Sequence, residues 1–207
     1  MALQPGQVIE NESFRIIREE MGPHRFNKME EPVVVRVIHA TADFDFSQIM
    51  RFSPDAVQAG IEALRKGCHI ITDVRMVEVG ISCRLLDRLG GSVLCLIADE
   101  AVRARAEREQ STRSTAAMRE LAPQMDGAVI AIGNAPTALL EVIRLIREEA
   151  VRPALIIGVP VGFVSAVESK DELVTMDTAH ITALGRKGGS TVAVAVLNAL
   201  LHQAVER

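Results

Sequence analysis

The sequence is short of several residue types, and each shortage excludes a class of protein. It contains no tryptophan and no tyrosine, and its formal net charge is −4. A generic nucleic-acid binder presents a basic surface with aromatic rings on which bases stack, so we expect no nucleic-acid partner. No apolar run approaches the roughly 20 residues that a membrane-spanning helix needs, so we expect no membrane partner either.

Cysteines and targeting signals are equally scarce. Cys68, Cys83 and Cys95 form no C-x-x-C pair, which favours buried structural thiols in a reducing compartment over metal ligands. No pair of histidines has convincing metal-ligand spacing, so we expect no protein metal site and no bound cofactor. The first residues contain no basic region followed by an apolar run, which predicts a cytoplasmic protein.

The sequence does contain a regular alternation of short apolar runs and amphipathic segments. The apolar runs are typical of strands buried on both faces of a parallel sheet, and they cover 69–73, 93–97, 128–132, 155–159 and 180–184. Helical patterns occupy 53–67, 99–109, 114–124, 136–149, 165–175 and 189–204. Repeated βα units predict a doubly wound α/β sandwich with about five strands. Without a repeat or linker, residues 1–207 are expected to form a single domain.

The N-terminal portion is predicted to be helical. Residues 7–20 fit an amphipathic helix that the Gly-Pro pair at 22–23 ends. A capping box at 27–30 precedes a second helix, and Pro32 lies just inside it. The β-branched run 33–38 alone could form a strand. Helix is the better prediction because the caps precede the run and the pattern continues beyond it.

Glycine-rich segments follow three predicted strands, at the edge where open α/β sheets bind ligands. They contain Asn134, then Gly162 and Lys170, then Arg186, Lys187 and Gly188. Glycine lets a backbone approach a ligand closely, and a helix N-terminus favours an anion, although the glycines could equally serve only as tight turns. A nucleotide- or phosphate-binding module is therefore one alternative. A Walker loop, however, places its lysine after the glycines, whereas Lys187 precedes them.

His39 is the most informative titratable residue. In a continuous helix, Arg36 lies three residues before it and Asp43 four residues after it, so the three share a face. A carboxylate one turn away would favour the imidazolium and hold the ring as a proton donor near neutral pH. A single histidine on a helix is nonetheless more often structural.

Arg113 is the second candidate, within Ser111-Thr112-Arg113-Ser114 ahead of a predicted helix. The hydroxyls can cap that helix while the guanidinium holds a carboxylate through two parallel hydrogen bonds. The alternative is a capped surface helix with a solvated arginine.

In combination and in this order, several segments resemble the precorrin-8X methylmutase family. They are Arg36–Asp45, Thr112–Ser114, Gly133–Leu139, Gly158–Val164, Glu168–Lys170 and Gly185–Ser190, and the resemblance extends from Ser13 to Leu200. It implies a flavodoxin-like three-layer α/β sandwich, a homodimer, and movement of a methyl group from C11 to C12 of a corrin precursor. The expected reaction is a [1,5]-sigmatropic shift that gives cobyrinic or hydrogenobyrinic acid.

The resemblance also implies roles for residues. His39 would be catalytic, and the glycine loops would line a tetrapyrrole. The residues expected to bind substrate are Ser13, Arg36, Asp43, Arg113, Ser114, Asn134, Gly162, Lys170, Arg186, Lys187 and Gly188. The stretches 41–45 and 185–189 together are more similar to the branch that acts on cobalt-precorrin-8 than to the metal-free branch acting on precorrin-8X, so cobalt would arrive inside the substrate. A non-catalytic tetrapyrrole carrier is the remaining alternative.

Overall fold

The computed structural model describes residues 4–206, and a single sheet organises them. Six strands lie in the order β1-β6-β5-β4-β2-β3. Their bounds are β1 Met50–Phe52, β2 His69–Thr72, β3 Ser92–Leu94, β4 Val129–Ile132, β5 Leu155–Gly158 and β6 His180–Ala183. Strands β2 to β6 are parallel, whereas β1 runs antiparallel to β6 at the edge of the sheet.

The parallel part of the sheet confirms the predicted strands. Its spatial order, β3-β2-β4-β5-β6, is the flavodoxin-like order, in which the strand order reverses between β2 and β4. Strands β4 and β5 are buried along their whole length, as continuous apolar runs predict. The sequence does not predict β1, because the three residues Met-Arg-Phe are too few to show an alternating pattern.

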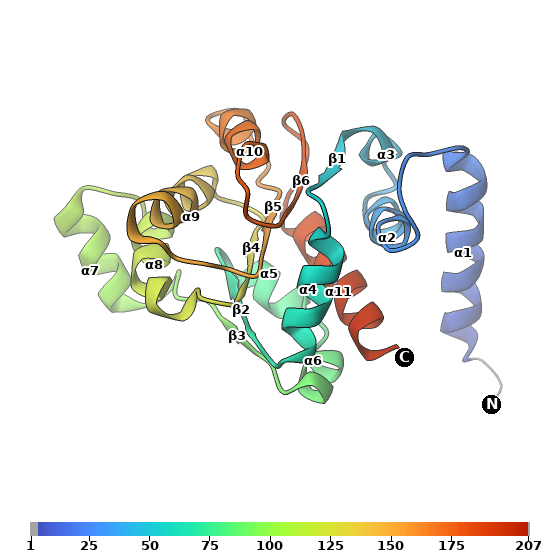
Figure 1. Ribbon diagram of the computed structural model, residues 1–207, viewed down its shortest axis with the longest axis horizontal. Helices are drawn as coiled ribbons and strands as arrows, with labels where there is room; N and C mark the ends of the chain where they lie inside the picture. The colour runs from blue at the N-terminus through green and yellow to red at the C-terminus, as the bar shows by residue number, and fades with distance from the viewer. Residues whose placement is uncertain (1–3, 207) are drawn as a thin grey trace.

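Helices cover both faces of the sheet (Figure 1). One apolar core joins the sheet to α2, α4, α5, α6 and α11, and a second joins the opposite face to α7, α8, α9 and α10. The bounds are α1 Pro5–Met21, α2 Glu31–Thr41, α3 Phe46–Ile49, α4 Ala56–Arg65, α5 Arg75–Gly80, α6 Cys83–Leu89, α7 Glu100–Glu109, α8 Arg113–Leu121, α9 Pro136–Glu149, α10 Ala166–Val174 and α11 Ser190–Val205. A 3₁₀ turn, η1 Ala122–Gln124, extends α8. This is the predicted three-layer sandwich.

The predicted helices are confirmed to within a few residues at their ends. The short helices α3, α5 and α6 are not predicted, because four to seven residues are too few to establish a helical period. Helix α1 lies at one end of the molecule and contacts α2 (Figure 1).

Helix α2 forms in spite of its β-branched run. The predicted capping box closes the turn before it, since Asn27 Oδ1 accepts from the N–H of Glu30 at 3.1 Å and Glu30 Oε2 accepts from the N–H of Asn27 at 3.0 Å. Val33, Val34, Val35, Val37 and Ile38 are all buried, and α2 packs along α11. Tertiary packing therefore overrides the weak helix propensity of the run.

A buried carboxylate fixes the carboxyl edge of the sheet. Asp73 directly follows β2 and is fully buried. It accepts hydrogen bonds from the backbone N–H groups of Gly133 at 3.0 Å, Asn134 at 2.8 Å and Ala135 at 2.7 Å. Burial raises the pKa of the Asp73 carboxyl, and the N–H donors oppose this rise by favouring the carboxylate. The loop after β4 is thereby fastened to the end of β2, where the strand order reverses.

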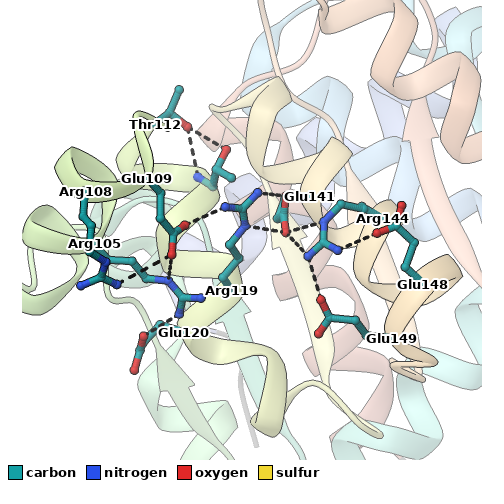
Figure 2. A network of polar contacts seen from close by, with 11 residues as sticks. Arg105, Arg108, Glu109, Thr112, Arg119, Glu120, Glu141, Arg144, Glu148 and Glu149 are labelled. Carbon is teal, nitrogen blue, oxygen red and sulfur yellow. Dashed lines mark hydrogen bonds and ion pairs between the residues drawn. The ribbon is translucent and has the colours of Figure 1, made fainter.

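Arginine and glutamate side chains fasten the outer helices α7 and α8 to α9 (Figure 2). Glu141 on α9 is 5% exposed and pairs with Arg119 at 2.9 Å and Arg144 at 2.6 Å. Burial alone would raise the pKa of Glu141, but the two guanidinium groups outweigh it and hold that pKa below its usual value. Arg119 also pairs with Glu109 of α7 at 2.7 Å, so the network crosses all three helices.

Three scarce features can be compared with the structure. Within residues 4–206, no helix combines the length and the apolarity needed to cross a membrane. The cysteines are free thiols, but Cys83 is exposed at the start of α6, so the prediction that all three are buried is wrong. The same residues contain no cluster of three His, Cys, Asp or Glu side chains that could hold a metal ion.

We predict that Asp73→Asn lowers the free energy of unfolding by about 2 to 3 kcal/mol, because the amide cannot accept from all three N–H groups and leaves a buried donor unpaired. Chemical denaturation would measure the change. The exposed Asp87 on α6 provides the control, and Asp87→Asn should change the same quantity by less than about 0.5 kcal/mol. Equal effects of the two substitutions would contradict the role assigned to Asp73.

The network in Figure 2 gives a second prediction. Glu141→Gln should cost about 2 kcal/mol of unfolding free energy, because Arg119 and Arg144 lose their shared carboxylate at a buried position. Glu148 pairs with the same Arg144 at 2.8 Å but its side chain is 64% exposed, so Glu148→Gln should cost less than about 0.5 kcal/mol. Thermal and denaturant unfolding of both variants would test the difference.

Candidate active site

His39 lies in the last turn of α2 and its side chain is exposed. Its ring meets Phe14 of α1 edge-on, with 5.1 Å between the ring centroids. The guanidinium of Arg36 lies 5.2 Å from the centroid of the same phenyl ring. The prediction that Arg36 and His39 share a helix face is therefore confirmed, and Phe14 contacts both.

The side chains of Arg36 and Ser13 both bond to residues of α1. The Arg36 guanidinium pairs with Glu10 of α1 at 3.2 Å. Arg36 also lines a cavity of about 400 Å³ between α1, α2 and α11, together with Phe14 and His202. The Ser13 hydroxyl, next to Phe14 in the chain, donates to the Ile9 carbonyl at 2.9 Å.

Asp43 does not share the face of His39, and this part of the prediction is wrong. Helix α2 ends at Thr41, and Ala42 adopts the left-handed conformation with φ 52°, so a four-residue spacing no longer corresponds to one helical turn. The Asp43 carboxylate instead accepts from Lys187 Nζ at 2.6 Å, and Asp45 accepts from the same ammonium at 2.6 Å. The Lys187 hydrogen bond holds the pKa of the Asp43 carboxyl below its usual value.

Lys187 belongs to the loop 185–189 between β6 and α11, which packs against the loop after β5. The Gly189 N–H donates to the Val159 carbonyl at 2.8 Å, and the Gly162 N–H donates to the Arg186 carbonyl at 3.2 Å. At Gly188, with φ 155°, an added Cβ would lie 2.3 Å from the Val159 oxygen, so only glycine fits. Gly162 and Gly188 therefore bring the two loops into backbone contact.

An exposed apolar surface lies beside these cations. Phe163 is 83% exposed and Val164 is 82% exposed, both in the loop after β5. The Arg186 guanidinium lies 5.2 Å from the centroid of the Phe163 ring. A flat aromatic ring next to a cation suits a flat, apolar ligand that has acidic groups at its rim.

Arg113 lies on the opposite face of the sheet, at the start of α8. Thr112 caps this helix by accepting from the Thr115 N–H at 3.1 Å, as predicted. The Thr112 hydroxyl is also 3.0 Å from the Thr137 hydroxyl in the first turn of α9. Because α9 follows the loop that contains Asn134, this contact places Arg113 and the exposed Asn134 at the same end of one layer.

Near Arg113, the buried Ser111 hydroxyl has no hydrogen-bond partner within residues 4–206. Ser111 and Arg113 line a cavity of about 440 Å³ with Gln110. Ser114, in the first turn of α8, is partly exposed. The exposed guanidinium of Arg113 at this cavity can bind a carboxylate.

Contacts place most of the predicted residues in three groups. The first contains Ser13, Arg36 and His39 in the layer of α1 and α2, the second contains Asp43, Gly162, Arg186, Lys187 and Gly188 around the loop 185–189, and the third contains Arg113, Ser114 and Asn134. Lys170 lies in none of them, because it is fully buried and its Nζ donates to the Lys187 carbonyl at 2.9 Å. The prediction that Lys170 faces a ligand is wrong in this respect, since its ammonium faces the protein backbone.

The nucleotide- or phosphate-binding alternative is disfavoured by the hydrogen bonds of these loops. At the start of α9, the N–H groups of residues 133–135 donate to the Asp73 carboxylate, which occupies the place where a phosphate would bind. At the start of α11, Lys187 already pairs with two carboxylates. The three N–H groups before α9 and the Lys187 ammonium therefore already have partners within the protein.

The predicted site residues do not include Asp73, which holds the loop after β4, or Thr112, which contacts Thr137 of α9. An ionisable residue directly after a buried strand is a usable signal for Asp73, because that position lies at the ligand-binding edge. No sequence signal connects Thr112 to Thr137, since 25 residues separate them and their contact arises from packing of α8 on α9.

Comparison with known proteins agrees with this geometry. The chain matches the precorrin-8X methylmutase family over residues 8–203. It is 50% identical over 200 residues to the cobalt-precorrin-8 methylmutase of Priestia megaterium, which covers 97% of this chain and 88% of the relative. It is 48% identical over 204 residues to that of Leptospira interrogans, covering 95% and 93% of the two chains.

A solved structure leads to the same family. The precorrin-8X methylmutase of Thermus thermophilus superposes with a TM-score of 0.90 at 45% sequence identity, and the match covers 96% of each chain. Fold, sequence and the order of the loops agree along nearly the whole chain. The chain therefore belongs to the precorrin-8X methylmutase family and is an isomerase of cobalamin biosynthesis.

Proposed function

We propose that this chain moves a methyl group from C11 to C12 of cobalt-precorrin-8, with His39 as the catalytic residue. The observation that supports this role is the position of His39, exposed at the end of α2 and joined through Asp43, Asp45 and Lys187 to the loop that also bears Arg186. The turn that bears His39 is thus linked to a loop whose Arg186 lies beside the exposed ring of Phe163.

The proposed step is a [1,5]-sigmatropic shift. The bond between C11 and the methyl carbon breaks, the bond between C12 and that carbon forms, and the double bonds of the macrocycle move accordingly. No atom is gained or lost, and no oxidant or methyl donor takes part. A protonated His39 donates a hydrogen bond or a proton to the macrocycle near ring C, polarises the conjugated system and recovers the proton afterwards.

The proposed substrate has several carboxylates, while the protein has a net charge of −4. Local cations must therefore hold the rim of the substrate. Arg186 beside Phe163, and the exposed Arg113 at the cavity that Ser111 also lines, are the groups that support this assignment. Lys187 pairs with both Asp43 and Asp45. We therefore assign Lys187 a structural role in the site.

We propose the cobalt-containing substrate because of the activities for which similar proteins are named. The relatives at 50% and 48% identity are both cobalt-precorrin-8 methylmutases. We also infer a homodimer in the cytoplasm. In support of the dimer, α1 presents Val8 and Ile9 to solvent at 53% and 69% exposure, and such apolar side chains favour contact with another chain.

We predict that the purified protein changes the visible spectrum of cobalt-precorrin-8 at constant mass, and faster than that of the metal-free counterpart. His39→Ala should retain fold and product binding, because the side chain is exposed at the end of α2, and should lose on the order of 10²- to 10⁴-fold in rate. Single-turnover absorbance combined with mass spectrometry would measure both.

His24 is an exposed histidine outside the site, and His24→Ala is the matched control. Near-normal turnover by His39→Ala would contradict the catalytic role. Binding without any spectral change in the unsubstituted protein would instead favour the non-catalytic carrier.

Arg113→Ala should weaken product binding about 10- to 100-fold, because a charged hydrogen bond to a carboxylate contributes about 1.5 to 3 kcal/mol. Arg113→Lys should recover only part of the affinity, since an ammonium cannot form two parallel bonds. Equilibrium titration with product would measure both variants. Arg108→Ala, on the exposed side of α7, is the control, and an unchanged affinity in Arg113→Ala would exclude the carboxylate contact.

A further inference from the structure

Lys170 on α10 is a buried cation that the proposed reaction does not use. Its side chain is 0% exposed, and its Nζ donates to the Lys187 carbonyl at 2.9 Å. Burial lowers the pKa of Lys170 to about 8, while the nearby Asp171 acts in the opposite direction. A buried ammonium without a paired carboxylate lowers the free energy of unfolding. Stability of the fold therefore does not explain why a lysine occupies position 170.

The acceptor of this hydrogen bond connects Lys170 to the site. Lys187 accepts from Lys170 through its backbone carbonyl and donates through its own ammonium to Asp43 and Asp45, each at 2.6 Å. Asp43 lies four residues after His39, just beyond the end of α2. Hydrogen bonds therefore connect the buried Lys170 on α10 to Lys187 and then to Asp43, and the backbone continues from Asp43 to the helix turn that carries His39.

The glycines of the loop around Lys187 allow its backbone several conformations, so contacts with the rest of the protein must select one of them. Gly185, Gly188 and Gly189 have φ values of 77°, 155° and 119°, in a region that glycine enters freely. The backbone bonds of Arg186 and Gly189 fix the two sides of the loop. The hydrogen bond from Lys170 fixes the peptide group between them, and with it the direction of the Lys187 side chain.

We propose that Lys170 is a positioning residue for the site. By holding the Lys187 carbonyl, it fixes the loop so that the Lys187 ammonium clamps Asp43 and Asp45 and sets the end of α2 against the carboxyl edge of the sheet. Lys170 does not touch the substrate. Its effect on turnover rests on the proposed catalytic role of His39, whereas its effect on the loop does not.

The test compares Lys170→Met, which keeps the length of the side chain and removes the donor, with Lys66→Met at the exposed end of α4. We expect Lys170→Met to have a nearly unchanged Tm, because removal of a buried charge offsets the loss of its hydrogen bond to the Lys187 carbonyl. Its product Kd should stay within about 3-fold, while kcat falls on the order of 10- to 100-fold, the scale of a small misplacement of a catalytic group.

Hydrogen exchange followed by mass spectrometry provides a readout without substrate. Lys170→Met should exchange faster at the amides of 185–189 and of 42–46, while the remaining segments and Lys66→Met match the unsubstituted protein. Unchanged exchange in both segments, or a fall in kcat that only accompanies a fall in Tm, would overturn the proposal. If Lys170→Met does not fold, Lys170→Gln, which keeps a shorter uncharged donor, undergoes the same measurements.

The two proposals fail in different ways. If the unsubstituted protein does not convert cobalt-precorrin-8, the proposed function is wrong, and exchange at 185–189 and 42–46 still decides whether Lys170 holds the loop. If the unsubstituted protein is active and Lys170→Met equals it in kcat, the positioning role is wrong and the proposed function stands.

Discussion

The need to pair backbone polar groups at the carboxyl edge of the sheet governs the arrangement of the site. Loops rich in glycine bring their peptide groups close to the interior, where water cannot satisfy them. Asp73 meets this need for three N–H groups and Lys170 for one carbonyl. These buried side chains of opposite charge complement the backbone instead of each other, and the positions of the loops, of Lys187 and of the end of α2 follow from that pairing.

The same pairing explains how a flavodoxin-like sheet can serve a ligand other than a nucleotide. In that fold the crevice where the strand order reverses commonly receives a phosphate group. Here a side-chain carboxylate occupies the corresponding donors after β4. The edge therefore offers an incoming ligand the exposed Phe163 and the guanidinium beside it. Fold and function are separable in this way because the loops, not the strands, decide what the edge can bind.

The sequence predicts the parallel strands and long helices because each has its own periodic or capping signal, and α2 is recognisable as a helix from the turn before it. It cannot predict where α2 ends, because a left-handed alanine at 42 leaves no glycine signal, and the partner of Asp43 changes as a result. It also leads to Lys170 being assigned to substrate binding, since only the packing of α10 against the sheet buries this side chain. The elements that carry the candidate residues are thus predictable from sequence, while the partners of those residues depend on contacts between distant segments.

The packing of α2 on α11 has a consequence for synthesis on the ribosome. The β-branched segment 33–38 is covered by a helix that begins 152 residues later, at Ser190 (190 − 38). An isolated 11-residue helix is only marginally stable in water. Until α11 emerges, the nascent chain therefore exposes an apolar segment with high β-propensity, of the kind that pairs with other extended chains. The helix that presents His39 is made early and becomes stable late, because it has to wait for α11 to emerge.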